Sequence, residues 1–187
     1  MQISDCRPDD LLSAALQAIH SEGTGPLDGL AAPIYLTDAE GRITYYNEAC
    51  VAFAGRRPVI GHDRWCVTWR LFEDDGTPLP HEQCPMAVAL REQRPVRGVE
   101  AIAERPDGTR VRVRPFPTPL FDEEGRLTGA LNMFAGTSDA EQAGFLEAQA
   151  TRCRRLATMI GDSVTVATLT RMAAEYEGRA GSLKRPH

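Results

Sequence analysis

Two histidines and two cysteines occur as pairs in one stretch of the chain that is rich in proline, glycine and aspartate. Cys66 lies four positions after His62, and Cys84 lies three positions after His81. Imidazole nitrogens and thiolates are the ligands that zinc prefers, and four of them can surround the ion tetrahedrally. The same side chains could instead provide a redox-sensitive pair, Cys66 and Cys84, or simply pack the loop.

Packing is the interpretation that we favour for this stretch, and we expect no bound metal. Both pairs mix a histidine with a cysteine, and both fall within a single irregular loop. We predict that Trp65, Cys66, Trp69 and Pro80 pack the loop, and that His81 caps the helix that follows it.

No familiar catalytic motif occurs in the sequence. It contains no glycine-rich phosphate loop, no His-Glu-x-x-His zinc motif and no Gly-x-Ser-x-Gly nucleophile turn. The acidic pairs Asp74-Asp75 and Glu123-Glu124 flank predicted turns, where solvated carboxylates are ordinary. We therefore expect no catalytic residues, and a protein that is not an enzyme.

Composition and charge exclude several further classes. The chain has 187 residues, 42% of them hydrophobic, and a net charge of −5, whereas general nucleic-acid binders are usually basic. No apolar run approaches the roughly 20 residues of a membrane-spanning helix, and the first residues lack a signal-peptide core. Five cysteines without a Cys-x-x-Cys pair fit reduced thiols. We expect a cytoplasmic protein that binds neither nucleic acid nor membrane.

The main body of the chain begins with a predicted hairpin and helix. Strands at Ile34–Leu36 and Ile43–Tyr46 flank a turn at residues 38–41, where Asp38 can bond back to the chain. Asn47 then precedes a helical run and is a plausible N-cap.

A second helix and three strands complete this body. The helix is expected at residues 85–93, with Pro85 in its first turn. The strands are expected in the stretches VRGVEAIAER, TRVRVRPFPTPLF and LTGALNMFAG. In the first, Val99 or its neighbours face inward, and the last lies at the centre of the sheet. Hairpin turns at PDGT and DEEGR connect them. An α+β fold follows, in which a five-stranded antiparallel sheet carries helices on one face.

Helices are also expected on both sides of this body. Residues 9–20 have an apolar stripe at helical spacing, and residues 139–180 form two helices that break at Gly161. Asp162 or Ser163 caps the second of these, so an αα-hairpin results. The predicted parts are an N-terminal helix with its linker (1–26), the main domain (27–137) and a helical extension (138–187).

The main domain resembles a PAS domain. The resemblance rests on IYLTDAEGRITYYNEA, on RPDGTRVRVRPFPTPLFDEEGRLTGALNMF and on the spacing between them. It implies a sensory or protein-interaction role in signal transduction. Many PAS domains hold a small ligand, a haem or a flavin between the sheet and the helices, and others have no known ligand.

The resemblance leaves the cofactor unknown. The reactive Asn-Cys-Arg motif of flavin photoreceptors is absent, and the helix at 85–93 contains no histidine to bind haem. We expect Cys50, on the earlier helix, to be a core residue. A haem or metal bound by the loop from His62 to Cys84, giving a redox or gas sensor, is the alternative. If a small molecule binds instead, we expect its pocket to be lined by six apolar side chains: Phe53, Trp65, Met86, Leu90, Phe116 and Met133.

Contact with other proteins is the expected mode of action. We expect an adaptor for a kinase or regulator, acting as a homodimer through helices outside the main domain. Leu11, Leu12, Leu16 and Ile19 would form an apolar patch that monomers rarely expose, unless their helix folds back on its own sheet. The stripe of Arg110, Arg112 and Arg114 is a solvated sheet face or a surface for an acidic partner.

Overall fold

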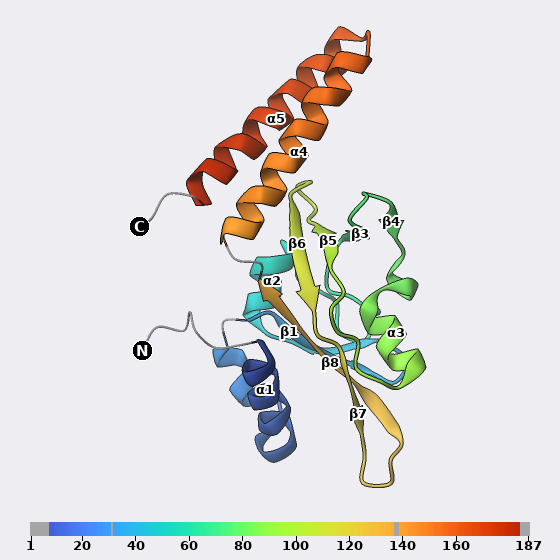
Figure 1. Ribbon diagram of the computed structural model, residues 1–187. Coiled ribbons are helices and arrows are strands. Elements are labelled where there is room, and N and C mark those ends of the chain that lie inside the picture. The colour runs from blue at the N-terminus through green and yellow to red at the C-terminus, as the bar shows by residue number, and fades with distance from the viewer. Residues whose placement is uncertain (1–7, 31, 137–138, 184–187) are drawn as a thin grey trace. The chain divides into compact units, whose positions relative to one another are not determined.

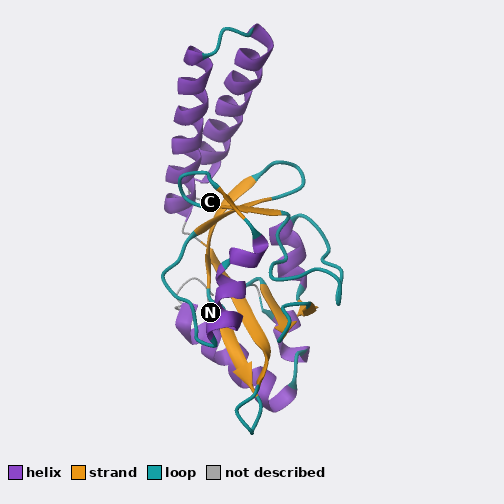
Figure 2. Cartoon of the chain, turned by 90° about the vertical axis from the view of Figure 1, so that its right-hand side faces the viewer, coloured by secondary structure: helices purple, strands orange, loops and turns teal. Residues whose placement is uncertain are grey.

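The computed structural model describes residues 8–30, 32–136 and 139–183. The chain divides into two compact units, Met1–Gly136 and Thr137–His187, each of which is described by itself (Figures 1 and 2). Among the described residues, no helix is both long enough and apolar enough to cross a bilayer.

The first unit combines three α-helices with an antiparallel sheet. Its helices are α1 (Pro8–Glu22), α2 (Glu48–Ala54) and α3 (Pro85–Glu92), with short 3-10 turns at Gly25–Gly29 and His81–Gln83. The strands are β1 (Ile34–Asp38), β2 (Ile43–Tyr46), β3 (Arg70–Phe72), β4 (Pro78–Leu79), β5 (Ala101–Glu104), β6 (Arg110–Pro115), β7 (Thr118–Phe121) and β8 (Leu127–Gly136). In the described part of the chain these make one eight-stranded sheet in the order β2-β1-β8-β6-β5-β3-β4, with β7 paired to β8.

Strand β8 lies at the centre of the sheet, as the sequence predicted. It pairs with β1 on one side, and along its length β7 and then β6 pair with its other edge. Because side chains alternate along a strand, β8 contributes to both faces: Phe134 packs among α2 and α3, and Met133 packs on the opposite side.

The core between the sheet and helices α2 and α3 is the larger of the two. Apolar side chains from the helices, including Met86 and Leu90 of α3, meet Tyr35 of β1 and Phe134 of β8. Cys50 of α2 is fully buried there, as expected.

Helix α1 covers the opposite face of the sheet, so the expectation that its apolar stripe forms a dimer contact is wrong and the alternative, a helix folded back on its own sheet, holds. Leu12 and Ala15 are buried against Ile34 and Met133, and Leu11, Leu16 and Ile19 pack beside them. The helix folds back on its own sheet because its apolar stripe matches the apolar side chains of β1 and β8 on that face.

Asn47 ties α2 to the N-terminal segment. Its Oδ1 accepts hydrogen bonds from the main-chain N–H groups of Cys50 and Ile34, which makes it the N-cap of α2, as predicted. Its Nδ2 donates to the carbonyls of Leu27, Leu30 and Ala32 over 2.9–3.3 Å. The side chain is 1% exposed, and both of its polar atoms are satisfied.

The expected number of strands was too small, for two local reasons. The loop predicted to be irregular contains the hairpin of β3 and β4, with a turn closed by the Glu73 N–H bond to Thr77. The long strand predicted at residues 109–121 is two strands, because proline at 115 and 117 interrupts it between β6 and β7. Val99 precedes β5 and is exposed rather than inward-facing.

The second unit is the predicted helical hairpin. It consists of α4 (Asp139–Met159) and α5 (Ser163–Leu183), and Asp162 caps α5 by accepting a 2.8 Å bond from the Thr165 N–H. Leu146 and Cys153 of α4 are buried with Tyr176 of α5. Ser138, which by its sequence position could cap α4, lies outside the described residues.

Candidate functional site

A small space lies inside the larger core, between the sheet and the start of α3. Its volume is about 10 Å³, which is room for about one water molecule. The lining side chains come from β1, β3, β5, β6, β8, α3 and the segments that precede β3 and α3: Tyr35, Cys66, Leu71, Cys84, Pro85, Met86, Ala101, Val113, Pro115, Asn132 and Phe134. The PAS-type position for a ligand is therefore almost filled by the chain itself.

Two polar side chains in this lining are joined by hydrogen bonds. The Tyr35 hydroxyl donates to the Trp65 carbonyl at 2.9 Å and accepts from Asn132 Nδ2 at 3.2 Å. Asn132 Oδ1 accepts in turn from the Phe116 N–H at 2.9 Å. Burial raises the pKa of Tyr35 well above its usual value, so the hydroxyl keeps its proton and acts as a donor.

Three cysteine thiols of this core are held in the protonated form. Burial raises the pKa of Cys84 to about 12, and it also raises the pKa values of Cys50 and Cys66. Cys50 Sγ donates to the Ile34 carbonyl at 3.2 Å, and Cys66 Sγ lies 3.1 Å from the Thr68 hydroxyl. Neutral, buried thiols are poor nucleophiles, because nucleophilic attack needs the thiolate.

The four side chains considered as an alternative zinc site are not arranged around one point. Within residues 8–30, 32–136 and 139–183, no group of three or more His, Cys, Asp or Glu side chains is arranged to hold a metal ion. His62 is exposed on the surface, whereas Cys66 and Cys84 face the inner core. The sequence spacing was suggestive only because the intervening β3–β4 hairpin could not be seen in it.

The packing expected for the same loop is only partly correct. Cys66 is buried and Trp65 packs on the core, but the Trp69 side chain is 50% exposed. The N-cap of α3 is Cys84, with no side-chain bond, so the prediction that His81 caps this helix is wrong.

The six residues expected to line a ligand pocket do not share one site. Phe53, Trp65, Met86 and Leu90 belong to the core beneath α2 and α3, although only Met86 borders the small space. Phe116 and Met133 pack with α1 on the opposite face of the sheet. Strand parity explains the error for Met133, because its neighbours Asn132 and Phe134 are the residues of β8 that face inward.

The family is decided by the match of a sequence model. The model of a PAS domain matches residues 31–135, which is more than half of the chain. The chain belongs to the PAS domain family. The match runs from the residues before β1 to the end of β8, so it spans the sheet, α2, α3 and the small inner space. PAS domains are sensory domains of signalling proteins, and this is the general role of the matched region.

Several solved PAS and light-oxygen-voltage domains resemble the chain at low identity. A light-oxygen-voltage domain studied with a flavin analogue is 18% identical, with 76% of this chain and 95% of that chain covered and a TM-score of 0.47. The light-state dimer of the fungal blue-light photoreceptor Vivid is 19% identical, with 72% and 99% covered and a TM-score of 0.46. The Rhodobacter sphaeroides light-oxygen-voltage protein is 14% identical, with 86% and 93% covered and a TM-score of 0.45. No curated protein matches the chain.

The inner space of this PAS domain does not fit a flavin or a haem. Either ring system is many times larger than the volume of about 10 Å³ that the side chains leave. Met86 and Phe134 are buried in this core, and both border the small space. We therefore derive no chemistry through either group.

The arginine stripe on β6 is paired within the chain. Arg112 and Arg114 each donate a 2.7 Å bond to Glu100, and Arg110 Nε donates a 2.8 Å bond to Glu104. These ion pairs neutralise most of the stripe, which lies on the sheet face away from α2 and α3.

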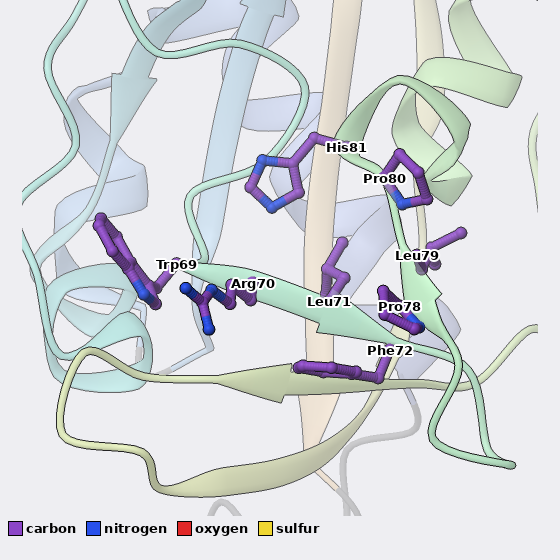
Figure 3. Close-up of a pocket in the computed structure, with 8 residues that line it drawn as sticks. All are labelled: Trp69, Arg70, Leu71, Phe72, Pro78, Leu79, Pro80 and His81. Atoms are coloured by element: carbon purple, nitrogen blue, oxygen red, sulfur yellow. The ribbon is translucent and has the colours of Figure 1, made fainter.

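A second, larger hollow opens at the edge of the sheet, beside the β3–β4 hairpin. Its volume is about 450 Å³, within the size range of small-molecule sites. Figure 3 shows the lining residues: Trp69, Arg70, Leu71, Phe72, Pro78, Leu79, Pro80 and His81.

Proposed function

We propose that this chain is a cytoplasmic protein-interaction module of the PAS family that acts on a partner kinase or regulator and carries no enzyme of its own. The observation that carries the proposal is the filled core. A domain whose inner space admits about one water molecule has little room for a ligand there, so contact with another protein is the remaining way to pass on a signal.

The state of the thiols supports the absence of catalysis. The thiols of Cys50, Cys66 and Cys84 are held protonated by burial, so these three side chains are poor candidates for the nucleophile of a cysteine-dependent enzyme. The alternative of a metal-bearing redox sensor lacks support from a group of three or more His, Cys, Asp or Glu side chains among the described residues.

A homodimer is part of the proposal, and its surface is assigned to the tip of the helical hairpin. Four large apolar side chains are exposed around the connection of α4 and α5: Leu156, Met159, Ile160 and Val164. Met159 and Val164 are 74% and 72% exposed, which is unusual for side chains of this size in a monomer. Helix α1 is not available for this role, because its apolar stripe is already covered by the sheet.

The proposed function is tested by capture and reconstitution. The full chain should retain one kinase or regulator from an extract of its source cells, and adding the purified chain should change the activity of that purified partner severalfold. The chain alone should show no turnover in phosphotransfer or hydrolase assays. Binding that leaves the partner's activity unchanged would contradict a signalling role.

A further inference from the structure

The turn that joins the β3–β4 hairpin to α3 directs one titratable side chain toward the interior, that of His81. The turn is the 3-10 helix His81–Gln83, in which His81 is half-buried and Glu82 is exposed. Figure 3 shows the imidazole on the same side of β3 as Leu71, opposite to Phe72. A charge gained by His81 would therefore appear on the inner side of the sheet.

This turn closes one end of the PAS core. The Cys84 N–H bonds to the His81 carbonyl at 3.2 Å. Cys84, Pro85 and Met86 follow the turn directly and border the small inner space. Cys84 is also the N-cap of α3 and makes no side-chain bond there. Loss of the turn would thus release the start of α3 and admit water to the inner space.

Nε2 of His81 has no hydrogen-bond partner. The atom is buried, and no group among the residues that the structure describes donates to it or accepts from it. A neutral imidazole has one N–H, whereas an imidazolium has an N–H on both nitrogens. Whichever nitrogen carries the proton at neutral pH, protonation would therefore leave a charged, buried N–H donor without an acceptor, which is costly.

The charged side chains of neighbouring elements do not compensate for this cost. The carboxylate of Asp63 lies near enough to favour the cation, but it is held by the Arg56 guanidinium and by the Val59 N–H at 3.0 Å. Arg56 itself disfavours a second positive charge beside it. From β3, Arg70 borders the same hollow as His81 and adds a further positive charge.

Burial of the imidazole decides its protonation state. Desolvation is the main cause that lowers the pKa of His81 below its usual value of 6.5, and the charge of Arg56 acts in the same direction. The carboxylates of Glu82 and Asp63 oppose this shift. The Cys84 thiol, at the start of α3, stays neutral because burial raises its pKa to about 12. His81 is therefore neutral near pH 7.

The lowered pKa fixes the direction of the pH dependence. A state in which the turn is open exposes His81 to water and binds the proton more readily than the closed state does. The closed state is therefore fully favoured above about pH 6.5, and it loses stability as the pH falls from there toward the lower pKa of the closed state.

We propose that His81 is an acid-sensitive switch of the PAS core: uptake of a proton by its imidazole releases the turn and opens the core at the start of α3. The proton comes from solvent and binds the ring nitrogen that is free in the neutral imidazole. Such a switch gives a domain with a filled core an input, the proton, that needs no ligand pocket.

Hydrogen exchange of backbone amides, followed by NMR on the full chain at about pH 7.5 and about pH 5.5, tests the switch. Division by the exchange rate of unstructured peptides at the same pH gives the opening equilibrium of each amide. The N–H groups of Cys84 and Val88, which bond to the His81 and Cys84 carbonyls, should open at least about threefold more at the lower pH. Because one proton is taken up, the increase cannot exceed about tenfold per pH unit. The amide of Cys50, in α2, should open equally at both.

Matched variants assign the effect to one side chain. His81→Gln cannot take up a proton, so its opening should be the same at both pH values. His62→Gln replaces an exposed histidine and should behave like the wild-type chain. An unchanged pH dependence in His81→Gln would overturn the proposal.

The wild-type chain alone also decides the question, even if His81→Gln does not fold. Opening at Cys84 should follow the titration of the His81 ring signals and not that of His62. Opening that is independent of pH, that follows His62, or that increases equally at Cys50 because the whole unit unfolds, would overturn the proposal.

Discussion

The hydroxyl of Tyr35 donates a hydrogen bond to the main-chain carbonyl of Trp65, 2.9 Å away, across the floor of the PAS core. Trp65 has a positive φ of 68°, which is uncommon for a residue with a side chain. The bond therefore links a fully buried residue of β1 to a strained point of the loop that closes the core.

Replacing Tyr35 with phenylalanine should destabilise the domain by about 1–3 kcal/mol, because Asn132 Nδ2 would lose its partner and the Trp65 carbonyl would keep only the long 3.9 Å contact with the Cys84 thiol. Urea denaturation followed by circular dichroism measures this. Tyr45→Phe is the matched control, since its hydroxyl bonds to Asp28 at the exposed surface and its removal should cost much less. Equal effects of the two variants would show that the buried bond is unimportant.

Gly41 makes the close approach of Trp65 possible. A Cβ at Gly41 would lie 2.1 Å from the indole ring, and the glycine has a φ of +81°. Gly41→Ala should therefore lower the free energy of unfolding and move the Trp65 ring. A drop in the denaturation midpoint together with a changed tryptophan fluorescence spectrum is expected. Gly61→Ala, also at positive φ but with open space around its Cβ, separates steric contact from backbone strain. A Gly41 variant no less stable than the Gly61 variant would contradict the steric argument.

Replacing Asn47 with aspartate should destabilise the domain more than replacing it with alanine. An aspartate would place carboxylate oxygens against the carbonyls of Leu27, Leu30 and Ala32, where the amide now donates. Alanine removes the bonds but adds no charge, and each unsatisfied buried group costs about 1–3 kcal/mol. The unfolding temperature at pH 7 should be highest for the wild-type chain, lower for Asn47→Ala and lowest for Asn47→Asp. The reverse order of the two variants would mean that the amide is not the donor in this network.

Glu100 should make the free energy of unfolding depend on pH in the acidic range. Hydrogen bonds from Arg114 and Arg112 hold the pKa of Glu100 below its usual value of 4.5. The folded state then binds this proton less readily than the unfolded state, so the stabilisation is complete above the unfolded pKa and is lost as the pH falls through the folded value. The stability difference between the wild-type chain and Glu100→Gln should be constant above about pH 5.5 and shrink below about pH 4.3. A difference that stays constant down to pH 3 would contradict this assignment.

The hairpin tip, and not α1, should control the oligomeric state. Met159→Asp with Val164→Asp should shift light scattering toward the single-chain mass of 20.5 kDa, since charges replace exposed apolar contacts. Thr151→Asp with Thr168→Asp adds the same charge at exposed polar positions of the hairpin and should leave the mass unchanged. A wild-type chain that is already monomeric at tens of micromolar would exclude the dimer.

The corresponding change in α1 should act on folding. Leu12 is buried against the sheet, so Leu12→Asp with Leu16→Asp should cost at least about 3 kcal/mol and lower the unfolding temperature. A stable, monomeric variant would instead restore α1 as a dimer contact.

Local signals explain how much of this fold could be predicted from the sequence. The turn at Asp38–Gly41, the cap at Asn47 and the proline at the start of α3 are fixed by neighbouring residues, and each was found. The β3–β4 hairpin was missed because its strands have only three and two residues, and one of these, Pro78, also suits a loop. Such a segment becomes a strand because β3 pairs with β5, which is distant in the sequence.

The candidate site was harder to predict than the fold. Met133 was chosen as a pocket residue instead of Asn132 or Phe134, which assigned the side chains of β8 to the wrong faces of the sheet. The sequence LNMF does not reveal the faces, because α1 covers one of them and apolar side chains therefore occur on both. The edge hollow depends on where β3 and β4 separate, which no pattern of residues marks. Trp69 borders this hollow, but its exposure could not be known from the sequence.

Native mass spectrometry of the freshly purified full chain tests the central claim most directly, namely that a filled PAS core acts through protein contacts. The account predicts only the mass of the 20.5 kDa polypeptide or its dimer, with no organic group retained in the core. A flavin, haem or other organic molecule bound at one per chain, and lost on Met86→Trp while Arg70→Gln retains it, would contradict the account.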